Sequence, residues 1–217
     1  MKIALIGATG FVGSAILPEL LNRGHHVTVL ARNPAKITPQ ERLNVVATDA
    51  LDSTQVAGAV KGHDAVISAY NPGWQEPELY DLFMQGSLAI REGVKRAGVK
   101  RLLVVGGAAS LYVAPGVQLF ETPDFQTHAP AFVIPGARAA RDELNRLRSE
   151  TALEWSFISP PANLFDGERS GAYRLGEENL LMDGERPAGI SQRDLAIAVV
   201  DEIEAPRHVR KRFTVAT

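Results

Sequence analysis

The sequence predicts an α/β protein built on one doubly wound, parallel sheet with helices on both faces. Short apolar runs alternate along the chain with longer segments that suit helices, which is the order of units in such folds. Most of these runs are nearly continuous, as in strands that are buried on both faces. Hydrophobic residues make up 45% and charged residues 22% of the 217 residues, as in an ordinary globular protein, and we expect a single domain over residues 1–217.

The first half of the chain is expected to contain five strands. These are Lys2–Ile6, His26–Ala31, Leu43–Ala47, residues 64–69 and Arg101–Val105. The predicted helices between them are residues 11–23, Ser53–Val60 with Asp52 as its cap, and residues 78–97. Pro18 lies inside the first helix, where it removes a backbone hydrogen bond. The alternation predicts right-handed crossovers between parallel strands.

Residues 112–136 are rich in proline and aromatic residues and only weakly periodic, so we predict a loop-dominated segment over the carboxyl ends of the strands. The remaining elements are predicted as a helix over 137–149, a strand over 153–158, a small hairpin of 172–175 with 180–182, a capped helix over 191–203 and a strand over 212–216. Loops 107–136 and 159–190 are therefore expected to form a small substrate-side region, mainly in the C-terminal half.

The charges and the absence of cysteine narrow the classes of protein. The 23 basic and 25 acidic residues are mixed along the chain and leave a net charge of -2, so we expect no nucleic acid or membrane partner. No apolar stretch approaches the roughly 18 residues of a membrane span. Without cysteine the chain has no disulfide or thiolate metal site, and we expect a cytoplasmic protein whose scattered histidines bind no metal. The sequence does not decide between a monomer and a homodimer.

A glycine-rich turn follows the first strand and opens the first helix. Gly7 allows a tight exit from the strand, Gly10 lets the backbone approach a phosphate, and Gly13 lets the helix pack closely on the strand. The free N–H groups at a helix start bind a pyrophosphate, so we predict a nicotinamide dinucleotide here. The residues expected to contact it are Gly7, Thr9, Gly10, Phe11, Val12 and Gly13. The spacing departs from the usual Gly-x-Gly-x-x-Gly, and an ordinary turn is the alternative.

The end of the second strand indicates which dinucleotide is preferred. An NAD-selective site places an acidic residue there for the ribose 2′-hydroxyl, whereas this chain has Arg32. A guanidinium can pair with the oxygens of a 2′-phosphate, and Asn33 and Lys36 are close enough in sequence to assist. The sequence therefore favours NADP(H) and leaves NAD(H) possible. The alternative is a solvated surface arginine.

Short polar segments follow the third and fourth strands, whose carboxyl ends meet the ligand crevice of a doubly wound sheet. Cofactor contacts are expected from Asp49, Ala50 and Leu51 after the third strand, and from Ala69, Tyr70 and Asn71 after the fourth. Asp49 can accept a hydrogen bond from the adenine amino group, or it can cap a turn or helix.

Several segments together resemble the atypical short-chain dehydrogenase/reductases, in particular the NADH-flavin reductase group related to biliverdin reductase B and to the NmrA-like proteins. The resemblance is carried by residues 7–13, 68–74, 104–111, 167–174 and 212–215 and spans almost the whole chain. It implies a Rossmann-like fold, a nicotinamide cofactor and a flavin or quinone-like acceptor.

The resemblance also implies roles for residues after the fifth and sixth strands. Gly106, Gly107 and Pro160 are expected to contact the cofactor, and Ser110 falls where relatives place a serine near the nicotinamide. We expect Ser110 to give an orienting hydrogen bond, with a capping serine as the alternative. Biliverdin reductase B has a histidine shortly after the prolines, where this chain has Ala162 and Asn163, so biliverdin is disfavoured as the substrate.

Well-known short-chain dehydrogenases carry Tyr-x-x-x-Lys on the helix after the fifth strand, but residues 132–146 contain neither tyrosine nor lysine. The usual acid for reducing a carbonyl to an alcohol is therefore missing. A flavin or quinone can accept hydride into a conjugated ring and take its proton from solvent. We therefore expect a reductase of such acceptors. The alternatives are an NmrA-like redox sensor that binds NADP without catalysis, and an epimerase or ketoreductase, which would need an acid–base pair.

Aromatic side chains in the predicted loops are candidates for stacking on a planar acceptor. We select Trp74, Tyr112 and Phe165 for this role, together with His128 from the long loop. Packing within the core or the loops is the alternative for most of them. Arg138 and Arg141 have helical spacing and can contact a phosphate or an acceptor carboxylate, although charged helix faces are usually only solvated.

Overall fold

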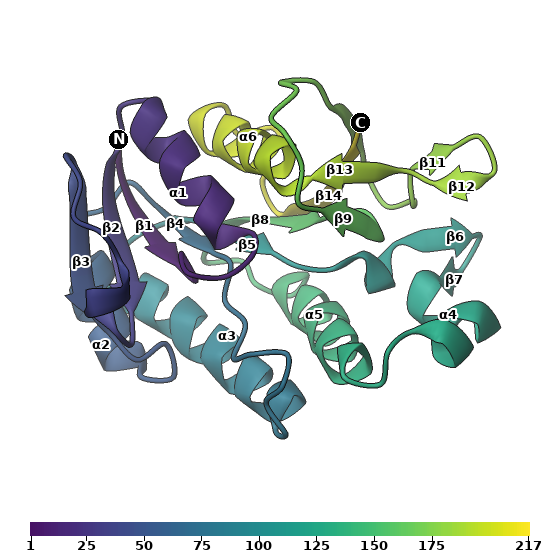
Figure 1. Ribbon diagram of the computed structural model, residues 1–217. Helices are drawn as coiled ribbons and strands as arrows, with labels where there is room; N and C mark the ends of the chain where they lie inside the picture. The colour runs from purple at the N-terminus through teal and green to yellow at the C-terminus, as the bar shows by residue number, and fades with distance from the viewer.

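The computed structural model describes residues 1–217 and contains the predicted doubly wound sheet (Figure 1). Its eight strands lie in the order β10-β14-β8-β5-β4-β1-β2-β3, and only β10 is antiparallel to its neighbour. The strands are β1 Lys2–Ile6, β2 His26–Ala31, β3 Leu43–Ala47, β4 Ala65–Ser68, β5 Arg101–Val105, β8 Glu154–Ser159, β10 Arg174–Gly176 and β14 Lys211–Ala216. The α/β prediction is confirmed, and the strand order changes direction beside β1, where such sheets bind ligands.

Helices cover both faces of this sheet. One face carries α1 (Gly13–Asn22) and α6 (Gln192–Glu204), which pack against each other. The other face carries α2 (Ser53–Val60), α3 (Leu79–Arg96) and α5 (Val133–Leu147) (Figure 1). The predicted helix after residue 190 is confirmed, since the Ser191 side chain caps α6 by accepting a hydrogen bond from the Asp194 N–H at 3.0 Å.

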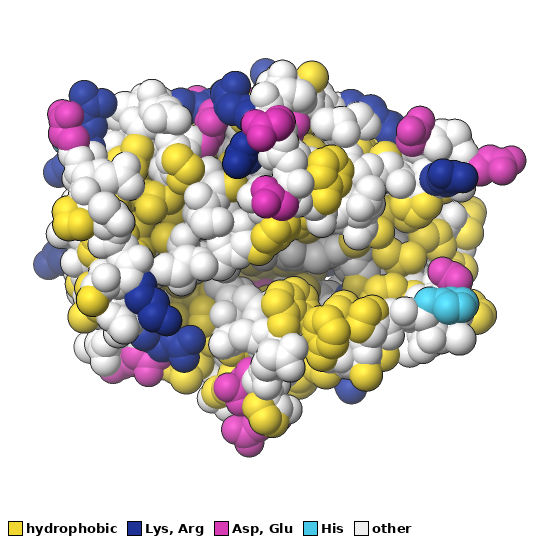
Figure 2. Space-filling view, in the orientation of Figure 1, with side chains coloured by type: hydrophobic (Ala, Val, Ile, Leu, Met, Phe, Trp, Pro, Cys, Tyr) yellow, Lys and Arg dark blue, Asp and Glu magenta, His cyan; other side chains and the backbone are white.

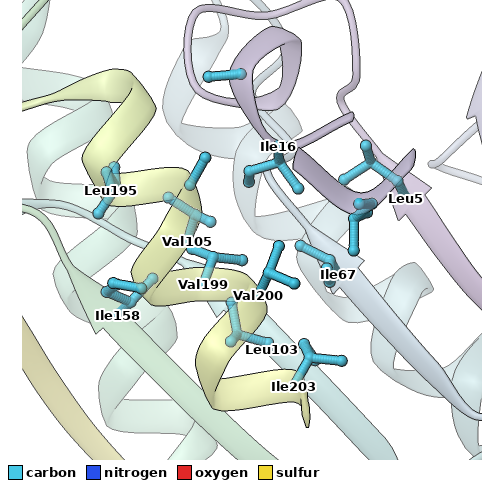
Figure 3. Close-up of a cluster of buried hydrophobic side chains, with 14 of the residues drawn as sticks. Leu5, Ile16, Ile67, Leu103, Val105, Ile158, Leu195, Val199, Val200 and Ile203 are labelled. Carbon is cyan, nitrogen blue, oxygen red and sulfur yellow. The ribbon is translucent and has the colours of Figure 1, made fainter. Parts of the chain in front are cut away.

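The larger core cluster lies between α6 and the sheet. Leu195, Val199 and Ile203 of α6 lie over Leu103 of β5 and Ile158 of β8, and all five are at most 2% exposed (Figure 3). A second cluster fills the opposite face, beneath α3 and α5. Because both faces are covered, the strand residues are apolar in succession, and this explains the continuous runs in the sequence.

Residues 112–132, predicted as mainly loop, form short elements instead. The hairpin of β6 (Tyr112–Ala114) with β7 (Val117–Gln118) precedes the helix α4 (Pro123–His128). The Thr122 hydroxyl accepts a hydrogen bond from the Phe125 N–H at 3.2 Å, and Pro123 takes the first helical position. The prediction was wrong because capping, and not periodicity, defines so short a helix.

The helix α5 begins at Val133, four residues before the predicted start at 137. Pro135 suggested a loop in the sequence, but it lies in the first turn of α5, where the helix needs no N–H donor.

The predicted hairpin of 172–175 with 180–182 does not form. Arg174–Gly176 pairs with β14 instead, and β11 (Met182–Asp183) pairs with β12 (Arg186–Pro187) around Gly184, whose φ is +59°. A further parallel pair joins β9 (Asn163–Phe165) to β13 (Gly189–Ser191). Arg174–Gly176 joins the edge of the large sheet through β14, which lies far away in sequence, so local sequence does not encode this pairing.

Pro18 lies inside α1, as the sequence indicated. It cannot donate to the Ser14 carbonyl, but both residues lie on the exposed side of the helix, where water can serve that carbonyl. No helix of the chain combines the length and the apolar character needed to cross a membrane.

Candidate functional site

The glycine turn between β1 and α1 has the geometry that the sequence suggested. Gly7 has a φ of +84°, and a Cβ placed on it would lie 2.2 Å from the Ala69 carbonyl oxygen at the end of β4. A Cβ on Gly13 would lie 2.0 Å from the Gly7 carbonyl oxygen, so a larger residue would force the helix away from the turn. A Cβ on Gly10 would meet only that same oxygen, at 3.3 Å, so the space around Gly10 is open to a ligand.

The N-terminus of α1 is free to bind an anion. No side chain caps this helix, and its first turn carries no acidic residue. The backbone N–H groups of Phe11, Val12 and Gly13 have no acceptor within the protein. Unpaired N–H groups and the positive end of the helix dipole together favour a bound phosphate. The local structure therefore fits a pyrophosphate.

A cleft of about 200 Å³ adjoins this turn. Most of the sequence-predicted cofactor residues line it, although they come from four separate loops: Gly7, Thr9, Arg32, Asn33, Asp49, Ala50, Leu51, Tyr70 and Asn71. Gly10, Phe11, Val12 and Gly13 belong to the adjoining turn, and Ala69 contacts Gly7 as described above. The carboxyl ends of β1, β2, β3 and β4 thus meet in one place.

The cleft is lined by both basic and acidic side chains. Arg32 and Lys36 line it without forming an ion pair. Asp49 and Glu76 line it as well, and the Asp49 carboxylate accepts a hydrogen bond from the Leu51 N–H at 3.0 Å. The turn-forming interpretation of Asp49 is therefore seen in the structure, and its second carboxylate oxygen remains available for a donor.

Tyr70 forms a wall of the cleft. Its hydroxyl donates to the Leu82 carbonyl oxygen at 3.1 Å, and its ring fills the space where a side chain on Gly86 would stand. Burial raises the pKa of Tyr70 to about 12, since the attraction of Arg32 is outweighed by burial and by the nearby carboxylates. Tyr70 therefore stays neutral and fixed, which suits packing against a ligand better than proton transfer.

The residues expected near the nicotinamide follow two neighbouring strands, since Val105 of β5 pairs with Ile158 of β8. Gly106 has no room for a side chain, because a Cβ there would lie 1.9 Å from the Phe157 ring, whereas Gly107 is open to within 3.6 Å. Pro160 follows β8 and is buried. None of these residues lines the 200 Å³ cleft, so they would meet only the far end of a long ligand.

Ser110 ends a short 3-10 helix after β5 and is 2% exposed. Its side chain caps no helix. Instead, the Ser110 hydroxyl oxygen accepts a hydrogen bond from Nη1 of Arg212 on β14, at 3.3 Å.

Exposed aromatic side chains occur in the loops at this end of the sheet. Trp74 is 47%, Phe165 43%, Phe132 49% and Phe11 48% exposed. Figure 2 shows a hollow across this face of the molecule with hydrophobic side chains along its borders. Exposed aromatic side chains suit contact with a planar ligand.

The other residues selected for the acceptor have different surroundings. Tyr112 is half-buried in β6, and its backbone bonds to Glu178 and Leu180. His128 ends α4 with an exposed side chain, 3.0 Å from the Asp124 carboxylate, and does not line the cleft.

The two arginines of α5 that the sequence analysis singled out are engaged within the protein. Arg138 lies over the Tyr80 ring at 5.1 Å, and Arg141 lies over the Phe120 ring at 4.7 Å. Arg141 also donates to the Asp142 carboxylate at 3.1 Å. No group of three or more His, Asp or Glu side chains is arranged to hold a metal ion.

Several lining residues were not among those expected from the sequence, including Ile6, Ala8, Leu30 and Ala31 at and beside the ends of β1 and β2. Glu76 and Pro72 belong to the loop after Asn71, and extending the expected segment would have included them. Thr48 directly precedes Asp49 and could have been found in the same way. Leu82 lies on α3, and no local signal points to it.

The comparisons with known proteins agree with this geometry. A family model described as NAD(P)H-binding matches residues 7–206. YwnB of Bacillus subtilis, an uncharacterized protein, is 38% identical over 100% of this chain and 99% of its own length. A candidate epimerase from Bacteroides thetaiotaomicron has a crystal structure with a TM-score of 0.90 and 44% identity, covering 99% of this chain and 96% of that chain.

A candidate NADH-flavin reductase from Streptococcus pneumoniae has a TM-score of 0.86 and 34% identity, covering 100% of this chain and 99% of that chain. The matched residues include the glycine turn and the strands β2, β3 and β4, and they begin directly after β1. The chain therefore belongs to the NAD(P)H-binding family, and its cofactor is a nicotinamide dinucleotide.

Proposed function

We propose that the chain is an NADP(H)-dependent reductase that transfers a hydride to a flavin or quinone-like acceptor. One observation carries the proposal: the cleft joins an uncapped helix N-terminus to two unpaired cations, Arg32 and Lys36. In addition, the helix α5, which follows β5 in the chain, carries neither tyrosine nor lysine. The first feature suits a dinucleotide with a third phosphate, and the second disfavours alcohol chemistry.

The preference for NADP(H) over NAD(H) rests on the side of the cleft after β2. Arg32 and Lys36 are exposed and have no carboxylate partner, so a 2′-phosphate would meet two free cations there. Asp49 lies after the neighbouring strand β3, where its free carboxylate oxygen would accept the adenine amino group. An acidic residue at position 32 would instead select the 2′-hydroxyl.

The protein's part in the reaction is positioning. A bound reduced nicotinamide supplies the hydride, and the acceptor ring takes it up together with one proton from water. The α1 N-terminus holds the pyrophosphate, and Trp74, Phe132 and Phe165 offer aromatic faces for a planar acceptor. Holding both rings in contact supplies the rate enhancement without a protein acid.

Two other functions differ in what they require of the same site. An epimerase must move protons on and off carbon, and α5 provides no acid–base pair for this, although one similar structure is described as a candidate epimerase. A redox sensor would bind NADP(H) and turn over nothing. Binding without turnover would therefore favour the sensor.

The test is the oxidation of NADPH by the purified protein with FMN, FAD, riboflavin or menadione as acceptor. We expect turnover with at least one of them and none with simple ketones. Gly13→Ala is the negative control, because its Cβ would lie 2.0 Å from the Gly7 carbonyl oxygen and would force α1 away from the turn that binds the phosphates. Tight NADPH binding without turnover of any of the four acceptors would overturn the proposal.

We also propose that the chain works in the cytoplasm, because it has no cysteine and so gains nothing from an oxidising compartment. Fractionation of the native source cells should recover it with the cytoplasmic proteins. Recovery among the secreted or other extracytoplasmic proteins would contradict this location.

A further inference from the structure

A buried arginine lies behind the serine at the end of β5. Arg212 of β14 is 3% exposed, and its Nη2 donates to the Glu178 carbonyl oxygen at 3.1 Å and also to the Glu178 carboxylate. Its Nη1 donates to the Ser110 hydroxyl oxygen at 3.3 Å and to the Ser159 hydroxyl oxygen at 3.5 Å. Glu178 thus balances the charge of Arg212, and Nη1 remains for the two serines.

This contact fixes the direction of the Ser110 hydroxyl. A guanidinium has donors only, so the serine oxygen must accept, and its own hydrogen must point away from Arg212. That hydrogen has no acceptor within the protein, and Ser110 is too buried to give it to bulk water. A buried donor without a partner is unfavourable. A ligand that reaches the end of β5 would supply the missing acceptor.

A second arginine–serine pair in the same sheet shows the contrast. Nη1 of Arg101, on β5, donates to the Ser156 hydroxyl oxygen at 2.8 Å. There the serine hydrogen has protein acceptors, since the Ser156 hydroxyl lies 3.0 Å from the Glu202 carboxylate and 2.8 Å from the His208 carbonyl oxygen. This pair lies at the amino end of the strands, away from the ligand cleft. At the carboxyl edge, in contrast, the hydroxyl hydrogens of Ser110 and Ser159 both lack an acceptor in the protein, and of the two only Ser110 lies outside the sheet, after the end of β5.

We propose that Arg212 is a positioning residue, which orients and polarises the Ser110 hydroxyl so that it donates a hydrogen bond to a carbonyl oxygen of the bound acceptor. This inference rests on the proposed reductase function. Negative charge grows on that oxygen as hydride enters the acceptor ring, and a donor backed by a cation stabilises this charge best. The serine keeps its proton, and the proton that completes the reduction comes from water.

The distances agree with a site that tightens around its ligand. At 3.3 Å the contact between Arg212 Nη1 and Ser110 is at the long end for an N–H···O hydrogen bond. Catalytic hydrogen bonds are often long in ligand-free proteins and shorten in the complex. Ser159 is in the same position relative to Arg212 but is fully buried within β8, so it provides a matched control.

The test is a double-mutant cycle with Ser110→Ala and Arg212→Gln, measured with NADPH and whichever of FMN, FAD, riboflavin and menadione the wild type reduces fastest. We expect each single variant to lower kcat by about tenfold to a hundredfold, with the KM for NADPH changed less than about twofold. The double variant should lie within about twofold of Ser110→Ala, because Arg212 acts through that serine. Ser159→Ala should stay within about twofold of the wild type.

Three results would overturn the inference. If the losses of the two single variants multiply in the double variant, Arg212 acts independently of Ser110. If Ser159→Ala loses as much activity as Ser110→Ala, the wrong hydroxyl has been assigned. Should Arg212→Gln fail to fold, Arg212→Lys replaces it: this variant keeps the buried cation but loses the planar fork that reaches Glu178 and Ser110 together, so a loss of kcat is still expected. A wild type that reduces none of the four acceptors removes the proposed function itself, and this inference with it.

Discussion

Replacing Arg32 by alanine should weaken the binding of NADPH and leave the binding of NADH almost unchanged. Arg32 is exposed and has no partner in the free protein, so its removal leaves no carboxylate unpaired and costs little in stability. Against a 2′-phosphate, the guanidinium would form charge-assisted hydrogen bonds worth about 1.5 to 3 kcal/mol, which corresponds to a roughly 10- to 150-fold weaker Kd for NADPH. Because the site is open to solvent, we expect the lower part of this range. The Kd for NADH should change by less than about threefold.

The assay is a titration of the fluorescence of bound NADPH and NADH, with Arg96→Ala as the control. Arg96 is an exposed arginine in the last turn of α3, outside the cleft. The Arg96→Ala substitution therefore removes the same charge as Arg32→Ala without removing a ligand contact. Raising the salt concentration should narrow the difference between wild type and Arg32→Ala. If Arg32→Ala weakens both dinucleotides equally, or neither, the assignment of Arg32 to a 2′-phosphate is wrong.

Three further predictions concern stability and the shape of the cleft. Burial raises the pKa of Glu143 from 4.5 to about 7, although the attraction of Arg91 opposes this shift. The folded protein therefore binds the proton more tightly than the unfolded chain does. As a result, the free energy of unfolding falls as pH rises from 4.5 to about 7, by up to about 3 kcal/mol. Glu143→Gln should flatten this dependence between about pH 5 and about pH 8 in urea unfolding, and an unchanged slope would contradict the cause given. Burial also disfavours the charged form of Asp194, but hydrogen bonds from the Gly171 N–H and from the Ser170 and Ser191 hydroxyls outweigh burial and lower the pKa of Asp194. The charged carboxylate therefore stabilises the fold above the pKa of Asp194 in the unfolded chain, and this stabilisation is lost as pH falls through the lower pKa of the folded protein. Asp194→Asn should therefore cost about 1 to 3 kcal/mol near neutral pH and less in acid, and an equal cost at both pH values would refute this. Gly86→Ala would place a Cβ 2.3 Å from the Tyr70 ring and displace the cleft wall, so calorimetry should show about 1 to 3 kcal/mol of destabilisation together with weaker NADPH binding.

The sequence predicts those site residues that directly follow the carboxyl end of a strand. Continuous apolar runs located β1 to β5 to within one residue, and parallel strands bring their carboxyl ends to one edge, so Arg32, Asp49 and Tyr70 could be assigned to one crevice although they are far apart in the chain. The three glycines could be interpreted individually, because each answers a separate backbone constraint.

Other parts depend on contacts that no local pattern encodes. β10 pairs with β14, the last strand of the chain, and not with the segment that follows β10 in sequence, so the predicted hairpin was wrong. Leu82 reaches the cleft only because α3 packs beside the end of β4. Ser110 and Arg212 are 102 residues apart, and their contact follows from the order of β5, β8 and β14 in the folded sheet. Predicting such a pair requires the topology first.

The central claim is that a dinucleotide binds at the glycine turn with its adenosine end between Arg32 and Asp49. A crystal structure of the protein soaked with NADP⁺ tests this most directly. We expect pyrophosphate oxygens at hydrogen-bond distance from the N–H groups of Phe11, Val12 and Gly13, a 2′-phosphate beside Arg32 and the nicotinamide toward Ser110. Density for the dinucleotide at any other place, or none in this cleft at a saturating concentration, would contradict it.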